Sequence, residues 1–588
     1  MKLPTFCKKT SALAICIALL AGCSDAPIHN SQSSTHEFAD SVYVNGVVYT
    51  QQESAAFAQA FAVKDGKFQA VGSQNEIKSL IGDKTEIIDL NKQFVIPGFI
   101  DEHIHPDMAA EYFIGVNVHE NMTWPEMAEE VKRVVAKQQT PGWIIGGAIH
   151  WLDTAGKPML GTDVPSHFST LDKLVNDRPI MLWDVGGHAL LLNSFAMNAL
   201  NLTKDDQVPE GGIFDKDENG ELTGVFREIA ANIIYEEALK SFPKGDALIE
   251  QGIKPIFNQL NSYGITSISD AWARYYMLDA YRTMARNNEL SVRIQAYISD
   301  PIEWNNQVWK DQAAIAIENH KDYRVGNWLK ADGVKFVLDG SAGGQTIIMV
   351  EPYEGTVDEH GGPWRNDPDY FAKNFAKYDA MGLTIKTHAV GSKSIRVALD
   401  AIESARKQGS TLRHNIAHTV FVHPEDKARF TKLDVVAEFS PHFWFPVPGW
   451  DLIRHELGQH RLDWAFPFNS LKQDGVNISV GSDWPVATSP NPFYELETMV
   501  TRQQPGGGDK TLPDENERIS LADAVEVFTL GGAYAQNREH LLGSIEVGKL
   551  ADFVVVDQNI FEVPVTDIHK TQVLQTVVDG KVVYALQQ

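Results

Sequence analysis

The stretch FVIPGFIDEHIHP, residues 94–106, decides the fold. It is an apolar run that ends on His103 and His105. Side chains on a strand alternate between its two faces, so these histidines project to one face about 7 Å apart and can converge on one metal ion. His-x-His alone is a common pattern, but here it closes a buried-type strand, and barrel enzymes build their active sites at strand ends.

Further strand-like runs alternate with helical stretches along the chain. They cover residues 264–270, 292–298, 333–338, 383–388, 415–419, 435–442 and 476–483. This alternation favours a parallel α/β architecture, and eight strands match a TIM (β/α)8 barrel. Residues 106–263 are too many for one crossover, so we expect an inserted subdomain after the first strand.

Both ends of the chain have a different texture. Short β-branched runs with Asn-Gly or Asp-Gly turns occur between Ser41 and Val71 and again between Asp552 and Tyr584, as in β-hairpins. We therefore predict a small composite β-sandwich from residues 41–97 and 545–588, and a barrel domain from 98 to 544.

The amino terminus has the pattern of an export signal. Lysines precede a short apolar run, and Leu-Ala-Gly-Cys follows at residues 20–23. This ending resembles the lipobox of bacterial lipoproteins, which implies a signal peptide over 1–22, a lipid anchor at Cys23 and a flexible tether over 23–40. A plain secretory signal or a single membrane helix stays open as an alternative, although the apolar run is short for a bilayer span.

The expected location is the periplasmic face of a membrane, reached only through the lipid on Cys23. Ser24 follows the cysteine where inner-membrane retention signals tend to carry Asp, and this resemblance favours the outer membrane.

Cysteine content and charge exclude several classes of site. Cys7, Cys16 and Cys23 are the only cysteines, so the body after the signal has no disulfide, no thiolate metal site and no cysteine nucleophile. Any metal must be held by nitrogen and oxygen. The net charge of −26 makes nucleic acid an unsuitable partner, and we expect a small-molecule substrate, with a homodimer left open.

Several motifs together resemble the amidohydrolase superfamily, and most closely its amidohydrolase family 3 branch of metal-dependent hydrolases, which includes N-substituted formamide deformylase. The likeness extends from about Val42 to Tyr584. The matching stretches are PGFIDEHIH (97–105), GVKF (333–336) with DGS (339–341), THA (387–389), RHNIAH (413–418), GSDWPV (481–486) and GKLAD (548–552).

The resemblance implies a centre with one or two divalent ions. His103, His105 and Asp483 would hold one ion, and His388 and His418 a second. Lys335 cannot ligate as an ammonium, but the family implies an N6-carboxylated lysine that bridges two metals. Zn²⁺ is the expected ion, with Mn²⁺ or Fe²⁺ as alternatives.

The implied mechanism uses metal-activated water, with Asp483 as both ligand and general base. His188 and His442 are candidates for the donor that stabilises the oxyanion, and each is as often a packed histidine. Trp151 and Trp444 are candidate substrate-binding residues, although aromatic residues more often fill the core. Many relatives carry Glu immediately before the strand-six histidine, whereas this chain has Ala417, which bears on the substrate type more than on metal binding.

The sequence therefore predicts a hydrolase that cleaves the C–N bond of an amide or N-formyl compound. A lactone, carbamate or ester hydrolase of the same superfamily is the first alternative, and a binding lipoprotein on the same barrel is the second. A one-metal deaminase is disfavoured because no Glu lies near His388, and the Gly-x-Ser-x-Gly elbow of serine hydrolases is absent from the sequence.

Overall fold

The structure is a computed structural model that describes residues 37–587 except 53, 118–123, 139–141, 150–166, 185–188, 342–345, 359, 445–449, 464 and 509–514. The chain divides into Met1–Glu37 and Phe38–Gln588, and all described residues except Glu37 belong to the second unit. The predicted signal peptide and the anchor at Cys23 lie outside the described residues. Among the described helices, none has both the length and the apolar character that a bilayer span requires.

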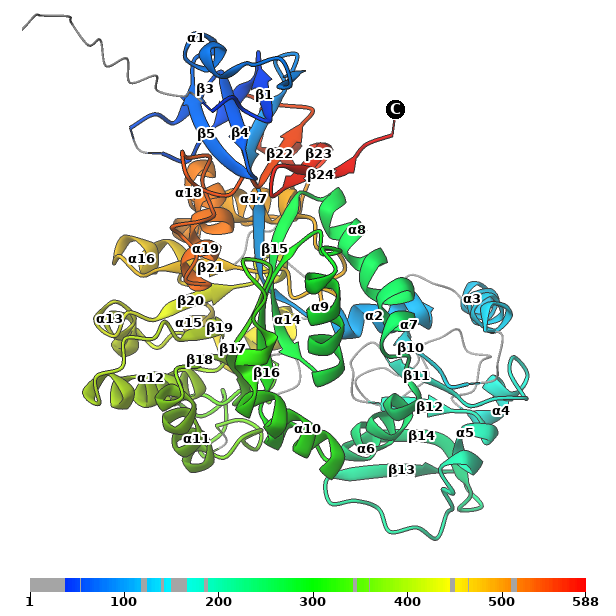
Figure 1. Ribbon diagram of the computed structural model, residues 1–588. Helices are drawn as coiled ribbons and strands as arrows, with labels where there is room; N and C mark the ends of the chain where they lie inside the picture. Colours follow the sequence, from blue (N-terminus) through cyan, green and yellow to red (C-terminus); the bar gives the residue numbers. More distant parts are fainter. Residues whose placement is uncertain are drawn as a thin grey trace, which may run out of the picture. The chain divides into compact units, whose positions relative to one another are not determined.

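Eight parallel strands form the central sheet, in the order β21-β20-β19-β18-β17-β16-β15-β8 (Figure 1). Their bounds are β8 Phe99–Ile104, β15 Ile265–Ala273, β16 Arg293–Ser299, β17 Leu329–Val337, β18 Thr384–Ala389, β19 Asn415–His418, β20 Val436–Phe439 and β21 Ile478–Val480. Each strand pairs in parallel with the strand that follows it along the barrel, as expected when every connection is a helical crossover. The predicted eight-stranded barrel is confirmed.

The first and last strands meet through their carboxyl ends. Ile104 forms a bridge with Trp484, and the amide of Asp483 donates to the carbonyl of His103 at 2.7 Å. Gly481 allows this approach, because a Cβ there would lie 2.1 Å from the backbone nitrogen of His103. The closure therefore brings residues 103–105 and residue 483 side by side.

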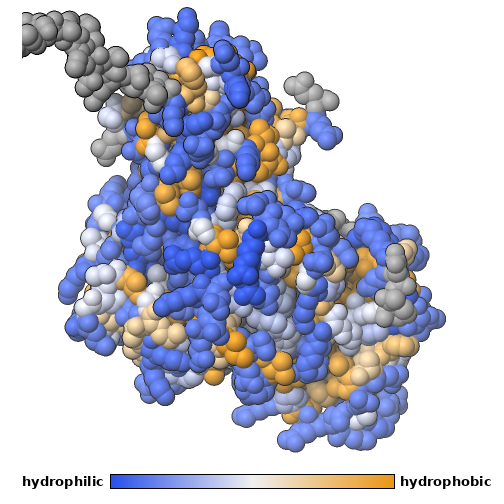
Figure 2. Space-filling view, in the orientation of Figure 1, coloured by the Kyte–Doolittle hydropathy of each residue, from blue (hydrophilic) through white to orange (hydrophobic). Residues whose placement is uncertain are grey.

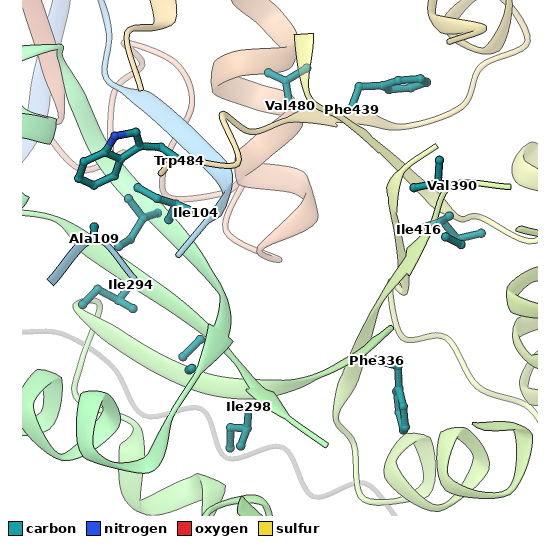
Figure 3. Packing of buried hydrophobic residues seen from close by; sticks show 14 of the residues in the cluster. Ile104, Ala109, Ile294, Ile298, Phe336, Val390, Ile416, Phe439, Val480 and Trp484 are labelled. Carbon is teal, nitrogen blue, oxygen red and sulfur yellow. The ribbon is translucent and has the colours of Figure 1, made fainter. Parts of the chain in front are cut away.

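Helices surround the barrel and pack on its outer face. Phe336 on β17 contacts Phe371 and Tyr378 of α11, and Phe439 on β20 contacts Phe468 of α16; Figure 3 shows Phe336 and Phe439 in this packing. The surrounding helices are α8 Lys254–Ser262, α9 Tyr275–Arg286, α10 Gln307–Glu318, α11 Pro368–Ala380, α12 Ser392–Lys407, α13 Lys427–Lys432, α14 Trp450–Leu457, α15 Gln459–Leu462, α16 Phe468–Gln473, α17 Pro492–Thr501, α18 Leu521–Glu526 and α19 Gly532–Ala535. Alternate residues of each strand are thereby left to face the barrel interior.

The long segment after β8 holds its own sheet, as predicted. After α2 (Pro106–Ile114), six strands are ordered β13-β14-β12-β11-β10-β9 and form a sheet separate from the barrel (Figure 1). Its elements are β9 Val116–Asn117, α3 Trp124–Lys137, β10 Ile144–Ile149, α4 Phe168–Asp172, β11 Ile180–Asp184, β12 Ala189–Leu192, α5 Ser194–Ala199, β13 Gly212–Lys216, β14 Leu222–Glu228 and α6 Ile229–Ala238. Buried Arg274, which follows β15, ties this insert to the barrel: it pairs with Asp107 at 2.8 Å and Glu111 at 3.2 Å on α2, and with Tyr235 of α6 at 2.9 Å.

Both ends of the chain contribute to two further sheets. One is ordered β5-β4-β1-β6 and the other β24-β23-β22-β7-β2-β3, so the carboxyl-terminal strand β22 pairs directly with β7 (Figure 1). The strands are β1 Ser41–Val44, β2 Val47–Tyr49, β3 Phe57–Ala58, β4 Ala60–Lys64, β5 Lys67–Gly72, β6 Glu86–Asp89, β7 Phe94–Pro97, β22 Phe553–Val556, β23 Val573–Val578 and β24 Lys581–Ala585. Tyr43, Phe61, Phe68 and Phe553 pack between the sheets. The composite β fold is thus confirmed, while the exact domain boundaries stay predictions.

The bounds of several predicted strands differ from the structure; for example, the run 476–483 is reduced to β21, Ile478–Val480. The run 94–105 is two strands, β7 and β8, because Gly98 separates a strand of the composite sheet from a strand of the barrel. The run 435–442 ends at Phe439, since Pro441 begins a short 3-10 turn that contains His442.

The side of the molecule shown in Figure 2 has a predominantly hydrophilic surface, in keeping with the charged composition.

Candidate metal centre

His103, His105 and Asp483 form a compact buried group at the carboxyl end of the barrel. Their nearest ligand-type atoms all lie within 4.8 Å of one another. Oδ1 of Asp483 is 3.1 Å from Nε2 of His105 and 3.7 Å from Nε2 of His103. The closure of β21 on β8 is what unites the histidine pair with the aspartate.

The other three predicted ligands adjoin this group. Nζ of Lys335, near the end of β17, is 3.4 Å from Nε2 of His103. The ring of His418 lies 4.7 Å from the ring of His103 and 4.4 Å from that of His388, measured between ring centroids. All six predicted residues therefore lie at the same mouth of the barrel. They come from β8 and the residue that follows it, β17, β18, β19 and the loop after β21.

Local backbone geometry helps to aim these side chains. Strand alternation turns Lys335 inward while its neighbour Phe336 faces α11. His418 and Asp483 have φ angles of 72° and 59°, in the left-handed region that non-glycine residues rarely adopt. Such strain is concentrated at functional sites, where the surrounding structure holds it in place.

Hydrogen bonds fix which nitrogen of two histidines can bind a metal. Nε2 of His388 donates to the carbonyl of Gly340 at 3.0 Å, and Nδ1 of His103 donates to Oε1 of Glu438. A carbonyl or carboxylate oxygen only accepts hydrogen bonds, so these two ring nitrogens carry the proton. The other ring nitrogens, Nδ1 of His388 and Nε2 of His103, therefore keep the lone pairs that metal coordination needs.

Behind His103 lies a buried charged group that the sequence interpretation missed. Glu438 on β20 contacts His103 and also Nζ of Lys386 on β18, and Lys386 donates to the backbone carbonyl of Glu102. The side chains of Glu438, Lys386 and Glu102 are fully buried. The available signal was the presence of charged residues inside otherwise apolar strands, such as VAEF at 436–439.

Two aspartates support the loops that carry the site. Asp101 accepts hydrogen bonds from the hydroxyl of Ser482 at 2.6 Å and from the amide of His103 at 3.2 Å. Asp339 accepts from the amides of Val390 at 3.0 Å and Gly391 at 2.8 Å, just after His388. Both carboxylates therefore hold neighbouring strand ends in register.

Burial sets the protonation of the site. It lowers the pKa of His388 to about 3 and lowers the pKa of His103 and His418 well below the usual range, so all three imidazoles are neutral at pH 7. Burial also lowers the pKa of Lys335 to about 8, with the nearby charge of Lys386 acting in the same direction. Neutral imidazoles are the form that binds metals, and an amine with a lowered pKa is partly neutral near pH 7.

This donor set fits a divalent cation. Zinc takes histidine nitrogen and carboxylate oxygen at about 2.1 Å, which puts two ligand atoms of a tetrahedral site roughly 3.4 Å apart. The 3.1 and 3.7 Å separations of Asp483 from the two histidines are close to that value. His103, His105 and Asp483 can therefore share an ion with little movement.

The remaining predicted site residues differ in where they lie. Nε2 of His442 lies 3.3 Å from Oγ1 of Thr488, and burial lowers its pKa to about 4 against the opposing charge of Asp483. Trp444 is fully buried against aromatic residues of the core, and its substrate-binding role stays a prediction that this packing does not favour. Trp151 and His188 lie outside the described residues.

The chain is similar to known proteins over most of its length. The chain is 28% identical over 558 residues to Protein LONG AFTER FAR-RED 3 of Arabidopsis thaliana, covering 93% of this chain and 92% of that protein. It is 24% identical to N-substituted formamide deformylase of Arthrobacter pascens, covering 93% and 99%.

Among solved structures, an uncharacterized metal-dependent hydrolase from Pyrococcus furiosus superposes with a TM-score of 0.71 at 23% identity, covering 88% of this chain and 99% of that one. This likeness supports the fold. The family model described as Amidohydrolase family matches residues 86–584, which include both the barrel and the returning carboxyl-terminal strands. The chain belongs to the Amidohydrolase family.

Proposed function

We propose that this protein is a metal-dependent hydrolase that cleaves a C–N bond of a small amide or N-formyl compound. The observation that carries the proposal is the buried group of His103, His105 and Asp483, whose ligand atoms lie within 4.8 Å of one another. The adjoining Lys335, His388 and His418 are the proposed holders of a second ion.

The bound ions, Zn²⁺ by expectation with Mn²⁺ or Fe²⁺ as alternatives, would supply Lewis acidity and activate water near neutral pH. Asp483 faces both histidines and is the proposed general base, taking a proton from the attacking water and returning it to the leaving nitrogen. His442, near Asp483, is the described candidate for a donor to the developing oxyanion, and His188 is the other proposed candidate. N6-carboxylation of Lys335 would replace an ammonium, which cannot ligate, by an anionic carbamate able to hold metal.

The choice of an amide or formamide follows from the full-length relative named N-substituted formamide deformylase. Lactone, carbamate and ester hydrolysis need the same water activation and stay as the alternative chemistry. A binding lipoprotein without catalysis is the remaining alternative, although binding alone does not require six convergent ligand-type residues.

Metal analysis and activity test the proposal together. We expect the purified body, from residue 24 onward, to contain one to two equivalents of metal and to hydrolyse members of a panel of amides, formamides and lactones. Removal of metal with a chelator should abolish turnover, and added Zn²⁺ or Mn²⁺ should restore it. Full activity in metal-free protein would refute the proposal.

We also propose that the protein is exported and anchored by a lipid on Cys23, at the periplasmic face of the outer membrane. The support is the basic start, the short apolar run and the Leu-Ala-Gly-Cys ending. Cys23→Ala should release the protein from the membrane fraction, and continued membrane association would contradict the anchor.

A further inference from the structure

Glu438 and Lys386 form a buried ion pair that the proposed chemistry does not use. Their side chains are fully buried, and Oε2 of Glu438 contacts Nζ of Lys386. Lys386 also stands 4.7 Å from the ring centroid of Tyr297 and 3.8 Å from Oε2 of Glu102. Burial of two charges is costly and gives little net stability over apolar residues, so the pair calls for a functional explanation.

Glu438 links the ion pair to the metal centre, because one of its carboxylate oxygens contacts His103 and the other contacts Lys386. Oε1 accepts from Nδ1 of His103, while Oε2 contacts Lys386. Both oxygens are therefore occupied on the side of His103 away from Asp483, whose Oδ1 lies 3.7 Å from Nε2 of the same ring. Glu438 contacts the ring nitrogen that would not face an ion.

We propose that Glu438 is a positioning residue for the metal centre: it fixes the tautomer and orientation of His103, and Lys386 holds the Glu438 carboxylate in place. The inference rests on the proposed function. Metal-binding histidines generally donate their second ring nitrogen to a carboxylate or carbonyl, which orients the ring and increases its basicity as a ligand.

The two histidines of the first strand differ in this support. Nδ1 of His105 is buried and has no hydrogen-bond partner among the described residues, whereas Nδ1 of His103 has Glu438. Among the described residues, hydrogen-bond support for the second ring nitrogen is thus found on His103 and not on His105, and His103 also lies against Lys335 and His418. Loss of Glu438 should therefore weaken metal binding at the centre as a whole.

The first test measures Zn²⁺ affinity by competition with a chromophoric chelator, independently of turnover. We expect Glu438→Gln to weaken Zn²⁺ binding about 10–100-fold, and Glu438→Ala to weaken it further because the acceptor is then lost as well as the charge. The visible absorption of the Co²⁺-loaded protein should change in both variants, since it reports ligand geometry at the ion.

Two further variants separate positioning from folding. Glu438→Gln leaves Lys386 as a buried, under-compensated cation and lowers stability, whereas the double variant Glu438→Gln with Lys386→Met removes both charges. We expect the double variant to recover only part of that stability, because buried Glu102 then loses the cation 3.8 Å from its carboxylate, and to keep the weakened Zn²⁺ affinity. Glu497→Gln is the matched control: Glu497 is buried and accepts from Nδ1 of His569 at 2.8 Å, away from the six site residues, so stability should fall while Zn²⁺ affinity is unchanged.

The outcomes distinguish the two proposals. Wild-type protein that binds no Zn²⁺ would overturn the proposed function, and the positioning role with it. Wild-type protein that binds Zn²⁺ no more tightly than the Glu438→Gln and double variants would overturn the positioning role alone. Recovery of Zn²⁺ affinity together with stability in the double variant would likewise assign the pair to folding only.

Discussion

Replacing Asp483 by Asn tests the proposed centre most directly, because it changes one charged oxygen and almost no volume. The carboxylate has two described neighbours of ligand type, Nε2 of His105 at 3.1 Å and Nε2 of His103 at 3.7 Å. An amide is a poorer metal ligand and cannot take a proton from water. The backbone bond from residue 483 to the carbonyl of His103, which closes the barrel, does not depend on the side chain.

The expected loss of turnover follows from the general-base role. A positioned base contributes about 10²–10⁴-fold in rate, which is about 2.7–5.4 kcal/mol in activation free energy. Loss of one metal ligand lowers the rate further unless the metal concentration is saturating. We therefore expect Asp483→Asn to lose at least about a hundredfold in kcat at saturating metal, with a thermal unfolding midpoint close to that of the wild type.

The assay is initial rate against substrate concentration for the best substrate of the amide and formamide panel, with metal content measured on the same samples. Asp567→Asn serves as the control, since Asp567 pairs with Lys570 on the surface and should leave kcat unchanged. If metal-saturated Asp483→Asn retains turnover within tenfold of the wild type, the assignment of Asp483 as base is wrong.

Three further predictions concern Lys335 in the metal centre, Arg293 between the barrel and the carboxyl-terminal segment, and Glu111 at the inserted subdomain. Lys335→Ala should lower turnover about a hundredfold or more, equivalent to about 2.7 kcal/mol, and short carboxylic acids should restore part of it by replacing the bridging carbamate. Arg293→Met should lower the free energy of unfolding in urea by about 3–5 kcal/mol, because buried Arg293 makes two bonds, of 2.7 and 2.9 Å, to Asp552 of the carboxyl-terminal segment and the variant leaves that carboxylate unpaired. Burial raises the pKa of Glu111 from its usual 4.5 to about 7, against the charge of Arg274, so its contribution to stability is present below about pH 4.5 and is lost as pH rises to 7. Glu111→Gln should remove that fall, worth up to about 3 kcal/mol, in urea titrations of the metal-free protein at pH 5 and 7.

Each of these expectations has a result that would contradict it. Wild-type turnover in Lys335→Ala would exclude the bridging role. Unchanged urea midpoints in Arg293→Met would show that its pairing with the carboxyl-terminal segment contributes no stability. A Glu111→Gln variant whose stability still falls between pH 5 and 7 by the wild-type amount would place the responsible titration elsewhere.

His103 and His105 were accessible from their spacing at the end of an apolar run, whereas Lys335, His388, His418 and Asp483 were assigned through the resemblance of their motifs to the amidohydrolase superfamily. His103 and His105 follow an apolar run at period-two spacing, and Asp483 follows another. In a parallel barrel the carboxyl ends of all strands share one mouth, so topology alone brings such residues together. The fold class followed from the same patterns, since alternation between strand and helix is written in the order of residues.

Strand ends and supporting contacts were less accessible. The sequence interpretation carried the first strand without a break across Gly98 and extended the seventh to His442, because pairing partners rather than local propensity decide where a strand stops. The substrate-binding role of Trp444 stays a prediction, and the structure buries its side chain fully against aromatic residues. Burial of an aromatic side chain depends on which helices cover it, and one strand's sequence does not contain that information.

The order of residues indicated an eight-stranded barrel with an insert and a composite β domain from both ends, and the resemblance of its motifs to a known superfamily supplied six candidate ligands near strand ends. Only the tertiary structure decided that Glu438 supports Nδ1 of His103, that Lys386 compensates Glu438, and that Lys335 lies 3.4 Å from the same histidine. The physical reason is range: periodicity reports on neighbours along one strand, whereas a charge buried in a barrel is stabilised by partners from strands that are far apart in sequence.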